Sequence, residues 1–146
     1  MSLDIARIAA AQPAGLPRYT SYPPANHFRP DAGPALLQPM LEAARAGGPL
    51  SIYMHIPFCD RMCWFCGCHT KQTLRYEPVA AFVKTLVAEI ALWGKSLGNR
   101  PVCRLHLGAA ALACCARELQ LIRAALDEAF DLSQAPEISF EIDPRM

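Results

Sequence analysis

Four cysteines fall within ten residues of this chain, in the segment Cys59-Asp60-Arg61-Met62-Cys63-Trp64-Phe65-Cys66-Gly67-Cys68. Cys59, Cys63 and Cys66 follow a C-x3-C-x2-C spacing. Three thiolates on one short loop can hold three irons of a [4Fe-4S] cluster. The fourth iron would then lack a protein thiolate, so it could bind and activate a small molecule, which a fully ligated electron-transfer cluster cannot do.

Two other kinds of site remain open on spacing alone. Zinc usually takes two C-x2-C pairs or downstream histidines, and here only His69 stands beside the loop. A closed cluster could take Cys68 as its fourth ligand, which would make the chain an electron carrier. The spacing favours the open cluster over both.

The composition limits where the chain works and what it binds. Seven cysteines, four of them clustered, without a basic stretch and apolar run at the amino terminus, predict a reducing compartment and a cytoplasmic location. Hydrophobic residues make up 53% and charged residues 18%, so the chain can bury a core. The net charge of +1 gives no footprint for nucleic acid or an anionic membrane. No apolar run approaches the roughly 20 residues of a membrane span.

Hydrophobic periodicity and breaker residues predict the elements that must position the loop. Strands are expected at 50–56, 102–107 and 137–142, and helices at 35–46, 78–97 and 117–130. Strands joined by helical crossovers form parallel sheets with right-handed connections, so the predicted fold class is α/β.

The expected domain organisation has two parts. Residues 1–49 form an extended, proline-rich N-terminal arm followed by a helix. Residues 50–146 form about three βα units, the first half of a truncated (β/α) barrel, because three strands neither close a barrel nor complete a sheet and the chain stops just after the third.

Three motifs resemble one family. His55-Ile56-Pro57-Phe58-Cys59, followed by the cysteine spacing and Cys68, resembles the radical S-adenosylmethionine (SAM) enzymes, and specifically the oxygen-independent coproporphyrinogen III oxidases (dehydrogenases). The arm at 17–23 and the third strand with its following Asp143-Pro144 are similar to the same family. The resemblance covers most of this chain and the N-terminal portion of the family's length.

The resemblance implies a function in haem and porphyrin biosynthesis. Cys59, Cys63 and Cys66 would ligate the [4Fe-4S] cluster, and SAM would chelate the open iron. One electron, from an unidentified donor, would release a 5′-deoxyadenosyl radical that takes hydrogen from a substrate propionate. Two oxidative decarboxylations of this kind would convert coproporphyrinogen III to protoporphyrinogen IX.

The resemblance also implies four cofactor-binding residues, each with a simpler alternative. Tyr53 would approach SAM, on the same strand face as His55, or would be a core residue. Phe65 would touch a second SAM, or would shield the cluster from water. Glu141 would contact SAM, or would be a solvated strand end. Gly108 would begin the SAM-binding turn.

The other cysteines have no assigned role in this reading. Cys68 is not expected to ligate the cluster. Cys103, Cys114 and Cys115 are expected to be small buried hydrophobes.

The turn after the second strand departs from the family. The family carries G-G-G-T-P there, and glycine is needed where the backbone approaches a ligand closely. Here Gly108 is followed by Ala109-Ala110-Ala111, which indicates a degraded SAM motif and a chain that is inactive alone. A short compensated frameshift would leave such a run, a hypothesis that the coding DNA would test. The alternative function is a non-catalytic iron–sulfur or haem-binding relative of radical SAM proteins.

Overall fold

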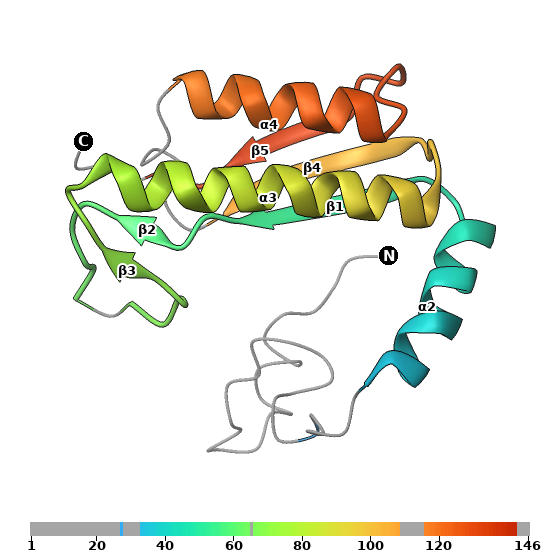
Figure 1. Cartoon of the computed structure of the whole chain (residues 1–146), viewed down its shortest axis with the longest axis horizontal. Helices are drawn as coiled ribbons and strands as arrows, with labels where there is room; N and C mark the ends of the chain where they lie inside the picture. Colours follow the sequence, from blue (N-terminus) through green and yellow to red (C-terminus); the bar gives the residue numbers. More distant parts are fainter. Residues whose placement is uncertain (1–26, 28–32, 65, 109–115, 143–146) are drawn as a thin grey trace, which may run out of the picture. The chain divides into compact units, whose positions relative to one another are not determined.

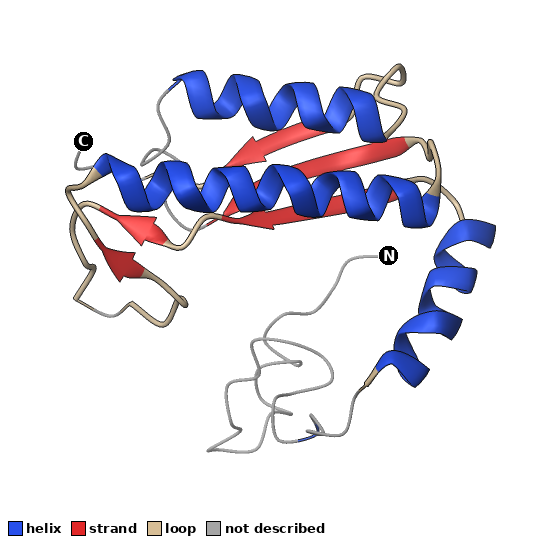
Figure 2. Ribbon diagram, viewed as in Figure 1, coloured by secondary structure: helices blue, strands red, loops and turns tan. Residues whose placement is uncertain are grey.

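The computed structural model describes residue 27 and residues 33–64, 66–108 and 116–142. Its main sheet contains β1 (Leu50–His55), β4 (Val102–Gly108) and β5 (Glu137–Phe140), all parallel, in the order β1-β4-β5 (Figures 1 and 2). Helix α3 (Tyr76–Leu97) precedes β4, and α4 (Ala116–Ala129) precedes β5. The predicted α/β class with parallel strands is confirmed, and the described residues form no closed barrel.

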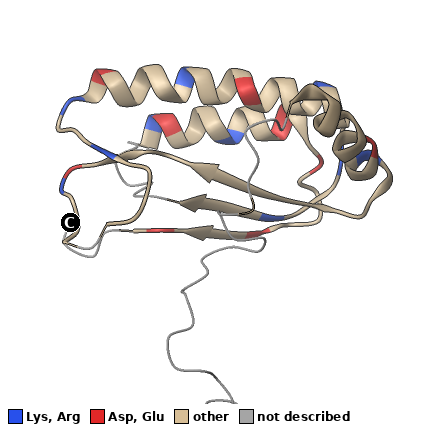
Figure 3. Ribbon diagram, turned by 90° about the horizontal axis from the view of Figure 1, so that it is seen from below, with Lys and Arg blue, Asp and Glu red and all other residues tan. Residues whose placement is uncertain are grey.

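Both crossover helices cover one side of the sheet, as Figure 3 shows. The apolar positions of the strands alternate toward these helices, because successive strand side chains point to opposite faces. Met54, Leu105 and Leu107 are buried on the helix side. The helices contribute the buried residues Val79, Val83, Leu86, Ile90, Ile122 and Leu126. The opposite face of the sheet carries the polar side chains of the same strands.

Contacts divide the chain into two compact units, Met1–Ala35 and Leu36–Met146. The first lies almost wholly outside the described residues, as does the predicted arm at 1–34. The second holds the sheet, its helices and nearly all of α2 (Pro34–Ala46). The expected domain boundary at 49/50 stays a prediction.

Helix α2 buries none of its side chains. Its carboxyl end is held by the Arg100 guanidinium, which donates to the main-chain oxygens of Arg45 and Gly48 at 2.7 Å each and also to that of Gly47. Arg45 in turn donates from Nε to the oxygen of Ser96 at 2.6 Å. In the described part of the chain, none of the helices combines the length and the apolar character that crossing a membrane requires.

Strand β4 contains one residue more than its partner requires. Leu50 pairs with Val102, but Ser51 pairs with Arg104, so Cys103 is the extra residue of a bulge. Its thiol donates to the oxygen of Leu50 at 3.3 Å and is exposed. The prediction that Cys103 is a buried hydrophobe is therefore wrong, because the bulge turns its side chain out of the alternation. Cys114 and Cys115 lie outside the described residues.

Several bounds differ from the predictions by one or two residues, and β5 ends at Phe140 where the sequence predicts a strand to residue 142. Helix α3 begins at Tyr76, so Pro78 is its third residue; the first helical turn needs no N–H donor, and proline is tolerated there. The segment predicted as one cysteine loop contains two short strands, β2 (Phe58–Cys59) and β3 (Lys71–Gln72), which pair in parallel. At its other end, α3 stops as expected at Gly98, whose φ of 78° favours glycine.

Candidate functional site

The cysteine loop leaves the carboxyl end of β1 and is closed at its base by β2 and β3 (Figure 1). Lys71 N donates to the oxygen of Pro57 at 2.8 Å, and Thr73 N donates to that of Cys59 at 3.0 Å. Gln72 adds a side-chain bond from Nε2 to the oxygen of Asp60 at 2.9 Å. The two ends of the loop are thereby held together at the edge where parallel α/β folds place their ligands.

The cysteines of this loop are free thiols with different exposure. Cys59 and Cys66 are half-buried, whereas Cys63 and Cys68 are exposed. Cys59 Sγ lies 3.3 Å from Thr70 Oγ1, and Cys66 N donates to the oxygen of Cys63 at 3.2 Å. Burial raises the pKa of the Cys68 thiol, and the neighbouring thiol of Cys66 raises it further.

The donor set suits iron. Thiolates are the ligands of iron–sulfur clusters, and three of them stand at C-x3-C-x2-C spacing on this loop. Among the described residues, no group of three or more His, Cys, Asp or Glu side chains is arranged to hold a metal ion. A [4Fe-4S] cluster would bind each cysteine thiolate on a different iron.

A row of polar side chains crosses the sheet face opposite the helices. We define the polar row as Tyr53 and His55 of β1, His106 of β4, Ser139 of β5, and Glu141, which directly follows β5. The strand register aligns it, since Tyr53 pairs with His106 and His106 with Ser139. Glu141 is fixed just beyond β5 because its N–H donates to the oxygen of Leu107 at 2.9 Å.

The first half of the polar row has a defined direction of proton donation. His55 Nε2 lies 2.7 Å from the main-chain oxygen of His69, which can only accept, so Nε2 carries the proton. In the neutral ring Nδ1 is then an acceptor, and the Tyr53 hydroxyl, 2.9 Å away, donates to it. The Tyr53 oxygen keeps its lone pairs as hydrogen-bond acceptors.

Gly108 lies directly against Tyr53. A Cβ placed on Gly108 would lie 2.6 Å from Tyr53 Cε2 and 2.8 Å from Cζ, distances that real side chains do not tolerate. Position 108 therefore needs glycine for contact with Tyr53.

Charge links the polar row to the end of the cysteine loop. Burial raises the pKa of Tyr53, and the nearby groups Glu141 and Cys68 raise it further. Glu141 and Cys59 act on Cys68 in the same direction. The phenol therefore stays protonated at neutral pH, as its donation to His55 requires.

The structure brings together most of the residues predicted from the sequence. Tyr53, Gly108 and Glu141 meet at the carboxyl edge of the sheet, beside the cysteine loop. Tyr53 is 57% exposed, so the alternative that it is a core residue is wrong. Phe65 and the alanines at 109–111 lie outside the described residues.

Sequence reasoning missed His106 and Ser139 as parts of the site. The alternation of 102–107 is a signal that His106 faces away from Leu105. No pattern within this segment, however, predicts that His106 lies beside Tyr53, because that contact depends on the pairing of two strands.

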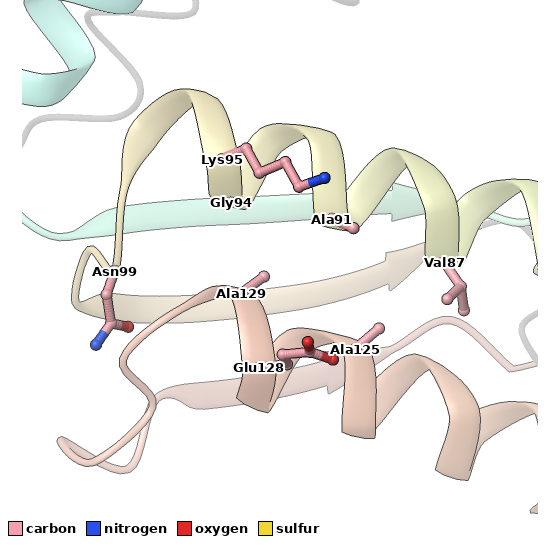
Figure 4. A pocket seen from close by; sticks show the side chains of 8 residues that line it. All are labelled: Val87, Ala91, Gly94, Lys95, Asn99, Ala125, Glu128 and Ala129. Carbon is pink, nitrogen blue, oxygen red and sulfur yellow. The ribbon is translucent and has the colours of Figure 1, made fainter.

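A groove between α3 and α4 lies on the other side of the sheet (Figure 4). Its volume is about 320 Å³. The groove exists because small residues line the contact between the two helices, where Gly94 faces Ala129. Lys95 and Glu128 stand at its lining. None of the polar row or of the loop cysteines lines it, so it is separate from the candidate site.

Comparison with known proteins gives a consistent set of relatives, although no family model matches the chain. It is 43% identical over 134 residues to an oxygen-independent coproporphyrinogen III oxidase of Paracoccus denitrificans, covering 90% of this chain and 30% of the relative. The enzyme of that name from Escherichia coli is 37% identical over 148 residues, covering 97% and 31%.

A solved structure of coproporphyrinogen III oxidase from Escherichia coli, described as a radical SAM enzyme, superposes with a TM-score of 0.75 and 32% identity. The match covers 99% of this chain and 31% of that one. The chain thus spans about 30% of the length of the curated relatives that it matches.

Proposed function

We propose that this chain, a homologue of the oxygen-independent coproporphyrinogen III oxidases over about 30% of their length, supplies the cluster-binding and SAM-binding part of such an enzyme. The reaction is the oxidative decarboxylation of coproporphyrinogen III to protoporphyrinogen IX. An electron donor and a cytoplasmic location, where the exposed thiols stay reduced, belong to the same proposal.

One observation carries the proposal: the cysteine loop and the polar row lie at the same edge of a parallel sheet. Cys59, Cys63 and Cys66 would ligate the [4Fe-4S] cluster. The cluster with its bound SAM would supply the electron and the hydrogen-abstracting chemistry.

The chain's own residues would bind and orient SAM. Tyr53 and Glu141 offer acceptor oxygens. Gly108 has no side chain, so the Tyr53 ring can pack against its backbone. We include Phe65 among the SAM contacts on the motif alone. Binding and orientation are what a protein contributes to a cofactor that carries the reactive chemistry.

A second candidate is a protein that holds the cluster without turnover. The sequence Gly108-Ala109-Ala110-Ala111 favours it, since the family's glycines admit the ligand at this turn. Both candidates require the same three thiolates, and they differ in whether SAM is cleaved.

Anaerobic reconstitution with iron and sulfide separates the candidates. We expect the wild-type chain to gain the broad visible absorption of a cluster, Cys63→Ala to lose it, and Cys103→Ala, outside the loop, to retain it. Release of 5′-deoxyadenosine and CO2 with coproporphyrinogen III would support the oxidase, and a stable cluster without cleavage would support the second candidate. A Cys63→Ala chain with an unchanged cluster would contradict the ligand assignment.

A further inference from the structure

His106 stands at the centre of the polar row and contacts two of the residues proposed to bind SAM, Tyr53 and Glu141. Its ring stacks on that of Tyr53 with centroids 5.4 Å apart and planes inclined by 16°. Its Nε2 lies 3.3 Å from Glu141 Oε1, and its Nδ1 lies 2.6 Å from Ser139 Oγ. One imidazole therefore connects β1, β4 and the end of β5.

The partners of His106 determine where its proton sits. An ionised carboxylate only accepts, so Nε2 must carry the hydrogen that faces Glu141. In the neutral ring Nδ1 is then an acceptor, and the Ser139 hydroxyl donates to it. The neighbouring His55 is assigned the same tautomer by the carbonyl of His69.

We propose that His106, as its Nε2–H tautomer, is a positioning residue that holds the Tyr53 ring and the Glu141 carboxylate in a fixed relation. The Tyr53 hydroxyl donates a hydrogen bond to His55, and Glu141 accepts one from His106, so both residues keep oxygen lone pairs that can accept further hydrogen bonds. Such a pair recognises a ligand through hydrogen-bond donors, as an ammonium group or sugar hydroxyls provide. SAM carries both; only this identification of the ligand rests on the proposed function.

Arg104 provides a matched control on the same strand and the same sheet face. It is two residues before His106 and forms an ion pair with Glu137 at 3.1 Å, with both side chains 68% exposed. This pair lies toward the amino end of the strands and includes neither Tyr53 nor Glu141. A general effect of changing this face would appear in Arg104→Ala as well.

The first test reads the tautomer by ¹⁵N NMR of the cofactor-free chain at about pH 8, above the usual histidine pKa. For the His106 ring we expect the pair of nitrogen signals typical of the Nε2–H tautomer, unchanged in Arg104→Ala and moved toward a mixed tautomer in Glu141→Gln. His106→Ala should shift the Tyr53 ring signals while the remaining spectrum is retained. A wild-type ring that is Nδ1–H, or averaged between tautomers, would overturn the proposal.

The second test measures SAM binding to the cluster-loaded chain by equilibrium dialysis. We expect His106→Ala to weaken binding about tenfold, the effect of losing one ring stack and one hydrogen bond of ordinary strength, and Arg104→Ala to change it less than about twofold. His106→Gln and His106→Phe each restore one kind of contact and should bind with intermediate affinity. Equal affinity of His106→Ala and wild type would refute the positioning role.

The two tests fail separately. If the wild-type chain takes up neither cluster nor SAM, the proposed function is wrong, and the tautomer measurement alone decides the role of His106. If SAM binds but the tautomer is mixed, the positioning role is wrong and the proposed function stands.

Discussion

Replacing Gly108 by alanine should disturb one side chain, that of Tyr53. The added Cβ would lie 2.6 Å from Tyr53 Cε2, so the ring must move. Moving it breaks the stack on His106 at 5.4 Å and the hydrogen bond to His55 at 2.9 Å. Because Tyr53 is 57% exposed, the ring can swing toward solvent and no core residue is displaced.

The expected cost follows from the contacts that are lost. A ring stack contributes about 0.5–1.5 kcal/mol and an ordinary hydrogen bond about 0.5–1.5 kcal/mol. Alanine returns about 0.4–1 kcal/mol by restricting the unfolded chain. The free energy of unfolding should therefore fall by about 1 kcal/mol, which lowers Tm by about 2–4 °C for a chain of this size.

A double-mutant cycle with Tyr53→Ala assigns that cost to the ring. Urea denaturation of the four chains gives the coupling, which we expect to be about 1–2 kcal/mol. In the Tyr53→Ala background, Gly108→Ala should be neutral or slightly stabilising. Gly67→Ala serves as the control, because a Cβ at Gly67 meets nothing within 4 Å, and it should stay within about 0.5 kcal/mol of wild type.

Equal destabilisation by Gly108→Ala in both backgrounds would refute this reasoning. It would mean that the backbone at position 108, and not the space occupied by Tyr53, requires glycine.

Two further predictions concern the helix contact and the titration of the site. Gly94→Ala would place a Cβ 2.7 Å from that of Ala129, so we expect a loss of about 1–3 kcal/mol in thermal denaturation, partly recovered by adding Ala129→Gly; no recovery would contradict the contact. Since burial and then Glu141 raise the pKa of Tyr53, this phenol should ionise above the ordinary tyrosine range, and its contribution to stability should decline as pH rises through the raised value. ¹³C NMR titration measures it, and Glu141→Gln should lower the pKa; an unchanged value would show that the carboxylate does not act on Tyr53.

Local pattern was sufficient for the long elements of this fold. Each predicted strand and helix forms within a few residues of its expected bounds, because hydrophobic periodicity is a property of neighbouring residues. The two-residue strands β2 and β3 could not be found this way, since two residues show no period. Their pairing depends on main-chain bonds across the loop.

The candidate site was predictable where a motif names the residue. Tyr53 and Gly108 were singled out by motif, and the structure adds that one needs the space beside the other. His106 was not found, because its importance comes from the strand order β1-β4-β5 and the register that aligns it with Tyr53. Register is set by tertiary packing, which the sequence pattern of one strand does not contain.

The bulge at Cys103 changes which residues of β4 face the helices. Strict alternation would turn Val102 to the same side as Arg104 and His106, yet Val102 is fully buried. The additional residue Cys103 shifts the inward–outward alternation of β4 by one position. Val102 therefore packs into the core, while His106 stays beside Tyr53. Deleting Cys103 would either expose Val102 or take His106 out of its register with Tyr53. A cysteine outside the cluster motif thereby allows one strand both to bury Val102 and to pair His106 with Tyr53.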